Sequence, residues 1–296
     1  MRSSEYHIGM KKCAFLSLEE RGGFVIDDEH AIDPMADLGW QVSTVSWRQT
    51  ETPWSDFDAV IVRSTWDYWN DVPCFLDTLA DINRQTRLAN PLDVMHWNLA
   101  KTYLQDLEGK GIGIVPTCWP DAVTAGSFAA YFTRLDTEEL VVKPVVGANG
   151  EYAYRVSHSD PAERLEWIAA NFRGRECMIQ QFMPRILDEG EYSLFFFNGA
   201  FSHAILKVPA KSEFRSQEER GAEIGSVKPP EKLLARGRQA LEAISGPLLY
   251  ARIDFVRNTR DDFVVMELEL IEPSMYLRTE PGAPCRFARA IDEWFD

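Results

Sequence analysis

Near the C-terminus the chain reads Tyr250-Ala-Arg-Ile-Asp-Phe-Val and, after a polar break, Phe263-Val-Val-Met-Glu-Leu-Glu-Leu-Ile-Glu-Pro-Ser. Both segments alternate with the period of two that is typical of strands, and the break between them predicts a hairpin turn. Pairing would bring Asp254 within roughly 8 Å of Glu267, with Glu269 on the same face. Close carboxylates repel one another unless a cation lies between them, and oxygen ligands suit a hard ion such as Mg²⁺. The alternative is that these acids form the solvated face of an ordinary hairpin.

Length, charge and cysteine content narrow the class of protein. A chain of 296 residues can form two or three lobes, and 45% apolar with 26% charged residues is a globular composition. The net charge of −15 gives no general affinity for nucleic acid or anionic membranes. The five cysteines form no C-x-x-C pair, which argues against a zinc site or a disulfide framework. Because there is no signal sequence and no long apolar run, we expect a cytoplasmic protein without nucleic-acid or membrane partners.

The first part of the chain alternates strands and helices. Strands predicted at residues 13–18, 41–47 and 59–63 indicate a small parallel sheet. The third strand runs into Arg63-Ser-Thr-Trp-Asp-Tyr, and open α/β sheets bind ligands at the carboxyl ends of their strands. We therefore expect a substrate pocket at this strand end, with Arg63 holding a carboxylate and Asp67 an ammonium group. The neighbouring candidates are Ser64 and Thr65, while Trp66 and Tyr68 either complete the pocket or pack in the core.

Two lysines and a glycine-rich turn come next. A helix predicted over residues 96–107 carries Lys101, and a strand predicted over residues 140–144 carries Lys143. That strand leads into Gly147-Ala-Asn-Gly, which we term the glycine loop (residues 147–150). Lysines attract phosphate oxygens, and glycines let backbone N–H groups approach them closely. The alternative is a tight hairpin with a surface lysine, and the chain contains no G-x-x-x-x-G-K-[ST] phosphate loop.

A further strand and a long polar loop follow the glycine loop. The strand predicted over residues 177–182 ends where it could present backbone groups to a flat heterocycle such as adenine, although by itself it is simply a core strand. Glu191 begins the next strand and could accept hydrogen bonds from ribose hydroxyls. Residues 207–221, which we term the basic loop, carry Lys207 and Arg215 in an otherwise acidic chain. Long loops in compact domains tend to be functional; the alternative is an ordinary charged surface loop.

In this order the pieces resemble the ATP-grasp fold, from about residue 91 to the C-terminus. The basic loop is the most specific part, because Lys207-x-Pro, then Phe214-Arg215-x-Gln217, is similar to the R-x-P…R-x-N…G loop of glutathione synthetase and RimK-like ligases. Lysine replaces the first arginine of that pattern, and glutamine replaces its asparagine. Glu267-x-Glu269 stands where the family usually has Glu-x-Asn. Within the superfamily, residues 63–68 and 269–274 most resemble the cycloserine-synthetase-like group.

The resemblance implies an α/β (α+β) architecture of three lobes. These are an N-terminal parallel α/β lobe at residues 1–90, a central ATP-grasp lobe at 91–185 and a C-terminal ATP-grasp lobe with the metal site at 186–296. It implies a phosphate-binding set made of Lys101, Lys143, Gly147, Asn149 and Gly150. It implies an adenine and ribose set made of Gln180, Gln181, Phe182 and Glu191. It implies Mg²⁺ ligands at Asp254, Glu267 and Glu269, and charge stabilisation during phosphoryl transfer by Arg215 and Lys207.

The substrate side is implied less completely. Its candidates are Arg63, Ser64, Thr65, Asp67, Gln217 and Glu272. Glu272 lies an odd number of positions after Glu269 and precedes Pro273, so we expect it to face away from the metal site, toward the acceptor.

The function that the resemblance implies is that of an ATP- and Mg²⁺-dependent carboxylate–amine ligase. A substrate carboxylate becomes an acylphosphate, and an amine then displaces phosphate to form an amide on amino-acid-type substrates. When both groups belong to one molecule, the product is a ring. The resemblance further implies one or two Mg²⁺ ions, for which Mn²⁺ can substitute, and a homodimer. The alternatives are a phosphotransferase acting on a small molecule, or an inactive ATP- or metal-binding regulatory protein.

Overall fold

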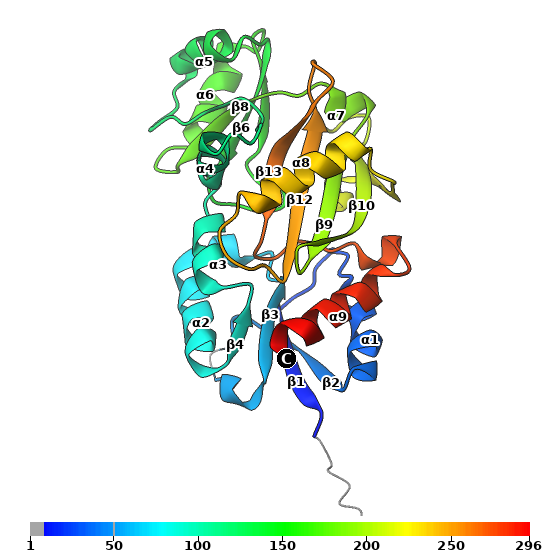
Figure 1. Cartoon of the computed structure of the whole chain (residues 1–296). Helices are drawn as coiled ribbons and strands as arrows, with labels where there is room; N and C mark the ends of the chain where they lie inside the picture. The colour runs from blue at the N-terminus through cyan, green and yellow to red at the C-terminus, as the bar shows by residue number, and fades with distance from the viewer. Residues whose placement is uncertain (1–8, 50) are drawn as a thin grey trace, which may run out of the picture.

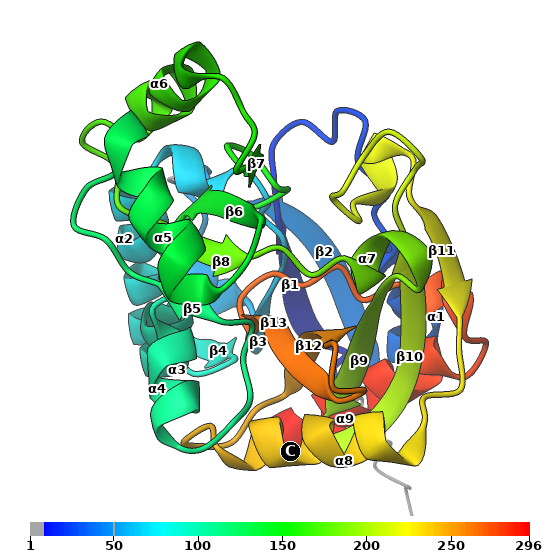
Figure 2. The same cartoon turned by 90° about the horizontal axis from the view of Figure 1, so that it is seen from above.

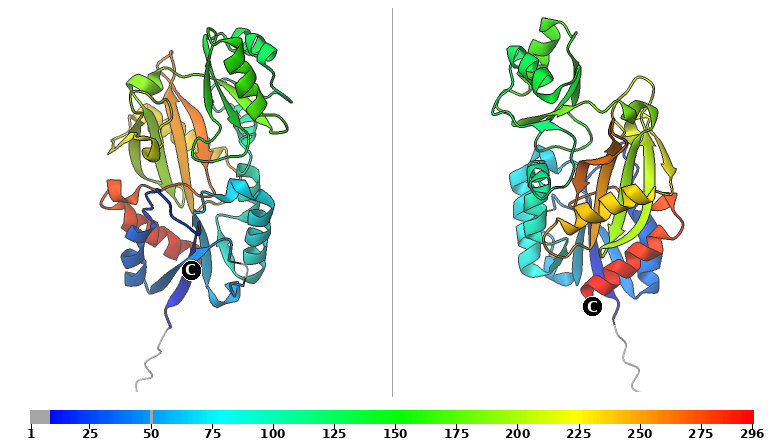
Figure 3. Two further views of the ribbon diagram at one scale, coloured as in Figure 1. Left: turned by 180° about the vertical axis from the view of Figure 1, so that it is seen from behind. Right: turned by 45° about the horizontal axis from the view of Figure 1, so that its top comes forward.

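Three β-sheets organise the chain (Figure 1). The structure is a computed structural model that describes residues 9–49 and 51–296. The sheet of residues 11–89 lies at the bottom of Figure 1, and the other two sheets lie above it; Figure 3 shows the same arrangement from two further directions. Viewed from above in Figure 2, the sheet formed within residues 117–181 stands beside the sheet formed within residues 191–269. Among the described helices, none is long and apolar enough to cross a membrane.

The first sheet is parallel, in the order β2-β1-β3-β4. Its strands are β1 (Lys11–Ser17), β2 (Trp40–Ser46), β3 (Ala59–Ser64) and β4 (Arg87–Ala89), and its helices are α1 (Ile32–Asp37) and α2 (Val72–Gln85). Alternation on β1 sends Cys13 and Phe15 to one face and Ala14 and Leu16 to the other, so both faces need cover. Helix α2 covers the face of Ala14, while α1 and the last helix, α9 (Ala283–Phe295), cover the opposite face.

The second sheet is antiparallel, in the order β5-β8-β6-β7. Its strands are β5 (Thr117–Cys118), β6 (Glu139–Pro144), β7 (Tyr154–Ser157) and β8 (Cys177–Gln181). Helices α5 (Phe128–Leu135) and α6 (Ala162–Asn171) share its apolar core, in which Phe132 and Ile168 pack against the strands. The short helix α7 (Arg185–Asp188) leads from this sheet into the third.

The third sheet has the order β11-β10-β9-β12-β13, with antiparallel neighbours. Its strands are β9 (Glu191–Phe197), β10 (Ala200–Val208), β11 (Glu223–Ser226), β12 (Tyr250–Arg257) and β13 (Phe263–Glu269). Helices α3 (Leu92–Asn98), α4 (Tyr103–Gly109) and α8 (Glu231–Glu242) bury their apolar sides against one face. At Gly237 a Cβ atom would stand 2.5 Å from Leu194, so glycine lets α8 lie directly on β9.

Three expectations are corrected by this fold. The helix predicted over residues 96–107 is broken into α3 and α4, and Lys101 lies in the turn between them because its N–H is bonded to Val145 O at 2.9 Å. Lys207 lies on strand β10, as the strand predicted over residues 201–207 required, but the polar stretch after it, expected to be a long loop, contains β11. Helix α9 follows the third sheet in sequence but packs between the first and third sheets, because its apolar side completes a core that both share. The proposed lobe boundaries therefore do not coincide with every core contact.

Candidate active site

The acid hairpin predicted from alternation is formed by β12 and β13. Asp254 lies opposite Glu267 in the antiparallel register, and Arg252 lies opposite Glu269. All four side chains come from the face of the sheet that α8 does not cover, because Ile253 and Leu268, at the alternate positions, belong to the core under α8. The predicted pairing of the acids is therefore confirmed.

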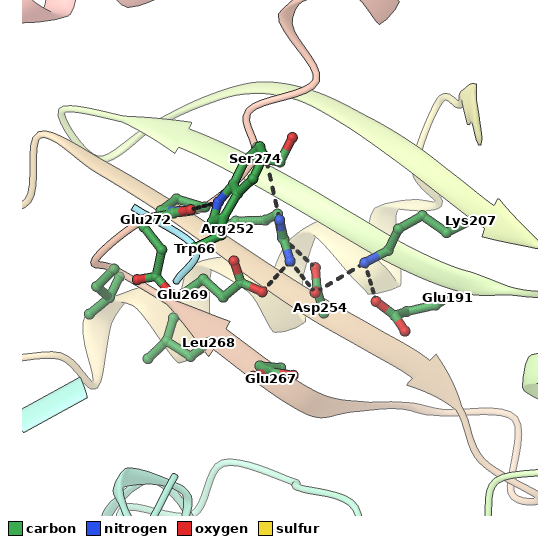
Figure 4. Close-up of polar contacts among 12 residues, drawn as sticks. Trp66, Glu191, Lys207, Arg252, Asp254, Glu267, Leu268, Glu269, Glu272 and Ser274 are labelled. Atoms are coloured by element: carbon green, nitrogen blue, oxygen red, sulfur yellow. Dashed lines mark hydrogen bonds and ion pairs between the residues drawn. The ribbon is translucent and has the colours of Figure 1, made fainter. Parts of the chain in front are cut away.

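Arg252 is the charged residue that sequence reasoning missed. Its guanidinium donates to both carboxylate oxygens of Asp254 at 3.1 Å, to Glu269, and to the carbonyl of Ser274 at 3.2 Å (Figure 4). Period-two alternation already places Arg252 on the face of Asp254, two positions away, so the signal was present in the sequence. Part of the negative charge of the hairpin is thus balanced from within the hairpin itself.

Lys207 supplies a second internal counter-charge. Its ammonium pairs with Asp254 at 3.2 Å and with Glu191 (Figure 4). Burial lowers the pKa of Lys207, but Asp254 and Glu191 outweigh burial and hold this pKa above its ordinary value. Burial raises the pKa of Asp254, and the opposing effect of Arg252 and Lys207 is larger, so the carboxyl stays ionised. Asp254 is only 3% exposed and lies beneath these two cations.

The two lysines expected to bind phosphate differ in their surroundings. Lys101 donates to Gly147 O at 2.7 Å and pairs with Glu267 at 3.0 Å. Lys143, on β6, makes no hydrogen bond or ion pair with any residue that the structure describes, although it lines the same pocket. Burial lowers the pKa of Lys143, and Glu267 opposes that effect. A partly buried ammonium that pairs with no described side chain attracts an anionic ligand.

One pocket gathers most of the predicted site residues. Residues of the loops beside the first sheet and residues of the second and third sheets line it together. The predicted residues that line it are Lys101, Lys143, Gly147, Asn149, Gly150, Gln180, Gln181, Phe182, Glu191, Lys207, Arg215, Gln217, Glu267, Glu269 and Glu272. Asp254 does not line it.

The glycine loop and the basic loop meet over this pocket. Arg215 donates to Gly150 O at 3.3 Å, and a Cβ atom at Gly150 would stand 3.0 Å from both Arg215 and Gln217. Gly150 has φ +63°, a conformation that favours glycine. Arg215 itself is paired with Glu213 at 2.6 Å. Burial raises the pKa of Glu213, but the hydrogen bonds and charge of Arg215 outweigh burial and lower this pKa to about 2.

The strand end expected to bind adenine is partly committed to the sheet. The N–H of Gln181 is bonded to Pro116 O at 2.9 Å, and the N–H of Phe182 is bonded to Glu139 O at 3.0 Å. The side chain of Gln180 donates to Thr117 at 3.1 Å. These residues line the pocket, but those two N–H groups cannot serve as donors to a base while the sheet is intact.

The strand-end candidates of the first sheet need correction. Arg63 is 1% exposed and donates to Asp28 at 3.0 Å and to Pro273 O at 2.8 Å, so it does not reach the pocket. Asp67 accepts hydrogen bonds from Trp47 and Arg48 instead. Ser64 and Thr65 do not line the pocket either. Trp66 and Tyr68, which follow them in the sequence, do line it. Core and loop contacts hold Arg63 because the segment after β13 folds over the strand end.

Glu272 also departs from expectation. It lines the pocket rather than facing away from the acids. Burial and then the Glu269 carboxylate raise its pKa to about 8, which indicates that the two carboxyls are close. Burial raises the pKa of Glu269, and Arg252 lowers it. The nearby carboxylates of Asp254 and Glu267 raise it again, so that the pKa of Glu269 is about 7.

Metal-binding capacity rests on Glu267 and Glu269. Among residues 9–49 and 51–296, no three His, Cys, Asp or Glu side chains are grouped closely enough to enclose a metal ion, because cations lie between the acids. The two glutamates nevertheless line the pocket beside the unpaired Lys143, and all-carboxylate oxygen donors are those that Mg²⁺ prefers. The residues present fit a hard divalent ion.

Comparison with known proteins agrees with this architecture. Residues 13–90 match the profile of the D-cycloserine synthetase DcsG N-terminal domain, and residues 119–255 match the ATP-grasp domain of prokaryotic glutathione synthetase. The chain is 30% identical over 275 residues to the cycloserine biosynthesis protein DcsG of Streptomyces lavendulae, covering 86% of this chain and 89% of that protein. The chain belongs to the ATP-grasp ligases, in the group of DcsG. The predicted family is confirmed.

Solved ATP-grasp structures share the fold over nearly the whole chain. The crystal structure of D-cycloserine synthetase DcsG has a TM-score of 0.83 at 26% identity, covering 96% of this chain and 100% of that one. The D-alanine–D-alanine ligase of Bacillus anthracis has a TM-score of 0.67 at 13% identity, covering 96% and 97%. The ATP-grasp ligase PsnB, solved with Mg and ADP, has a TM-score of 0.67 at 12% identity, covering 97% and 99%. ATP and Mg²⁺ are general to this family, as predicted.

Proposed function

We propose that this protein is an ATP- and Mg²⁺-dependent carboxylate–amine ligase that closes a ring within one amino-acid-type molecule, to give a cyclic amide of the cycloserine kind. The observation that carries this proposal is the 30% identity to a cycloserine biosynthesis protein along 86% of the chain. The pocket supports it by combining unpaired Lys143, the two loops and a carboxylate cluster in one cavity. The three proposed lobes, at residues 1–90, 91–185 and 186–296, would enclose the nucleotide.

Nucleotide binding would use the two lysines and the glycine loop. The ammonium of Lys143 has no partner to give up among the described residues, and Lys101 would exchange Glu267 for phosphate oxygens. The glycine loop would cover the γ-phosphate, because Gly147, Asn149 and Gly150 line the pocket and Gly150, at φ +63°, adopts a conformation that favours glycine. The adenine and ribose would lie toward Gln180, Gln181, Phe182 and Glu191.

Metal binding would use Glu267 and Glu269, joined by Asp254 if Arg252 and Lys207 release it. Mg²⁺ at this site supplies positive charge that neutralises the phosphates of ATP. Until that charge arrives, Arg252 and Lys207 pair with Asp254, Arg252 also pairs with Glu269, and Lys101 pairs with Glu267. We propose two Mg²⁺ ions, with Mn²⁺ able to replace them; titration of activity against each metal tests both points.

The chemistry itself requires positioning and charge rather than a protein nucleophile. A substrate carboxylate oxygen forms a bond to the γ-phosphorus while the bond from that phosphorus to the ADP oxygen breaks. The amine nitrogen then attacks the acyl carbon, phosphate leaves, and the nitrogen loses a proton. Arg215 lies where the glycine loop meets the basic loop and would stabilise charge on the phosphoryl group during its transfer. Lys207, which lines the same pocket, would add to this stabilisation.

A product analysis tests the proposed function. The enzyme is incubated with ATP, Mg²⁺ and a panel of amino acids and O-substituted serines, and ADP and organic products are measured. ADP release together with an amide supports the ligase, and a cyclic product with no second substrate supports ring closure. A stable phosphorylated product would favour a phosphotransferase. Absence of nucleotide turnover with every compound would favour a binding protein.

Cell location and assembly belong to the same proposal. The five cysteines include three buried thiols and form no disulfide, which supports a reducing cytoplasm. We expect a homodimer, and light scattering on the purified protein measures it.

A further inference from the structure

Glu272 and Tyr68 are two buried polar side chains that line the pocket without using their polar atoms. Glu272 is 9% exposed and Tyr68 is 4% exposed. Within the part of the chain that the structure describes, neither the carboxylate nor the phenol hydroxyl makes a hydrogen bond or an ion pair. Burial and next the Glu272 carboxylate raise the pKa of the Tyr68 hydroxyl, which indicates that the two groups are close. Because both side chains line the pocket, these polar groups are available to a ligand that enters it.

The backbone that carries Glu272 is held rigidly. Five consecutive carbonyls, at residues 271–275, each accept a hydrogen bond from a side chain. The donors, in order, are Tyr250, Trp66, Arg63, Arg252 and His203, at 2.8, 2.8, 2.8, 3.2 and 2.9 Å. They come from the third sheet, from β3 of the first sheet and from the loop after β3, so the backbone on both sides of Glu272 is fixed. Such pre-organisation is typical of binding groups.

An aromatic side chain lies beside Glu272. Trp66 donates to the Glu272 carbonyl and packs edge-on against Phe24, with ring centroids 5.1 Å apart. Figure 4 shows Trp66 beside Glu272 and Glu269. The carbonyl of Trp66 accepts a hydrogen bond of 3.2 Å from Asn149, so this wall is joined to the glycine loop. A carboxylate with aromatic neighbours favours an alkylammonium group, because charge and ring faces both attract a cation.

The local charge also points to a cation. Glu269 and Glu272 are close, and the nearest guanidinium, Arg252, is engaged by Asp254, Glu269 and a backbone carbonyl. Lys101 is engaged by Glu267 and Gly147. No described cation therefore remains to pair with the Glu272 carboxyl, and an arriving ammonium group could take that place.

We propose that Glu272, Tyr68 and Trp66 form the site for the ammonium group of the substrate, and that the enzyme selects compounds with a primary amine there. This inference rests on the proposed ligase function and assigns its amine-recognition corner. Asp67, the acid that sequence position suggested for this role, is excluded by its contacts with Trp47 and Arg48. Glu272 and Tyr68 accept hydrogen bonds from the ammonium, while the aromatic walls exclude water.

Binding measurements on the full-length protein test the inference. The enzyme is saturated with Mg²⁺ and ADP, and calorimetry compares the D and L forms of alanine and serine with lactate and glycerate, in which a hydroxyl replaces the amine. We expect at least one amino acid to bind about 10- to 100-fold more tightly than its hydroxy acid, the range for a charged hydrogen bond. In Glu272→Gln this preference should fall to within about threefold, and Tyr68→Phe should weaken it less.

Asp67→Asn is the matched control, since it makes the same chemical change on the competing acid. Retention of the preference in Asp67→Asn, with its loss in Glu272→Gln, supports the site. Equal binding of amino and hydroxy acids, loss of the preference in Asp67→Asn alone, or no binding of any amino acid would overturn it. Melting curves exclude unfolded variants.

A separate assay keeps the proposed function distinguishable. Hydroxylamine captures acylphosphates as hydroxamates, so hydroxamate formation from ATP and an amino acid reports the ligase chemistry alone. Amine-selective binding without hydroxamate would contradict the ligase and leave the ammonium site standing. Hydroxamate formed equally from amino and hydroxy acids would support the ligase chemistry and contradict the ammonium site.

Discussion

The side-chain oxygen of Asn98 accepts a 2.8 Å hydrogen bond from the backbone N–H of Leu270. The same amide donates to Leu268 O at 2.9 Å, so Asn98 pairs with the outer edge of β13 as a neighbouring strand would. Glu267 and Glu269 flank Leu268, and their carboxylates point into the pocket. Residue 98 therefore sets the position of the proposed metal ligands without touching a ligand itself.

Replacing Asn98 by alanine should damage both stability and turnover. It leaves a buried N–H and a buried C=O without partners, which costs about 1–3 kcal/mol. Displaced glutamates should lower kcat about tenfold or more while KM for ATP changes little. Asn98→Asp keeps the acceptor for Leu270 and should retain part of the stability. Denaturant unfolding and ADP-release kinetics measure the effects; unchanged unfolding of the alanine variant would contradict this role.

Glu267→Gln should abolish turnover and leave the fold intact. The substitution removes one ligand charge and also relieves repulsion from Asp254. The free energy of unfolding should therefore stay within about 1 kcal/mol of that of the parent protein. ADP release should fall by about 100-fold or more at any Mg²⁺ concentration. Glu163→Gln, on the exposed side of α6, makes the same change away from the site. Full activity of Glu267→Gln would remove the metal assignment.

Arg215→Ala should lower kcat more than it weakens ATP binding. The arginine reaches the pocket from the basic loop, and its proposed role is to stabilise charge that develops only during phosphoryl transfer. We expect a loss of about 10³-fold in kcat and less than about tenfold in nucleotide affinity. Arg215→Lys keeps the charge but not the planar fork and should recover part of the rate. An equal loss in both quantities points to ground-state binding instead.

Stability should fall as pH rises across neutrality. Burial raises the pKa of Glu272 from 4.5 to about 8, so between these values the folded state holds a proton that the unfolded state has lost. The free energy of unfolding then decreases with rising pH by at most about 1.4 kcal/mol per pH unit for this group. Glu272→Gln should flatten the profile between about pH 5 and 8. Urea unfolding at several pH values measures it, and an unchanged slope in the variant contradicts the assignment.

Gly237→Ala should destabilise the protein although alanine favours helices. The added methyl group would stand 2.5 Å from Leu194 and 3.1 Å from Phe196 in the core under α8. Overpacking costs about 1–3 kcal/mol and exceeds the gain of about 0.5–1 kcal/mol in helix propensity. Gly109→Ala, at the end of α4, meets nothing within 4 Å and should be neutral or stabilising. A more stable Gly237→Ala variant would show that α8 can shift.

Local periodicity was sufficient for the acid hairpin and for most strands. Asp254 faces Glu267 because alternate residues of paired strands share a face whatever the rest of the chain does. The same rule places Arg252 beside them, and counting cations as well as acids on that face would have found it. The order of the lysines and loops along the chain was sufficient to predict the ATP-grasp fold, since this order reflects the succession of lobes.

The sequence by itself thus determined the strands, the family and the set of residues that could serve ATP. Only the tertiary structure decided which of them reach the pocket. Arg63 is held by Pro273, and Lys101 lies in a turn rather than a helix, because of contacts with residues far away in sequence. Glu272 turns toward the acids because side chains from distant elements bind each carbonyl of residues 271–275. Such long-range hydrogen bonds leave no local pattern, since either partner alone would be satisfied by water.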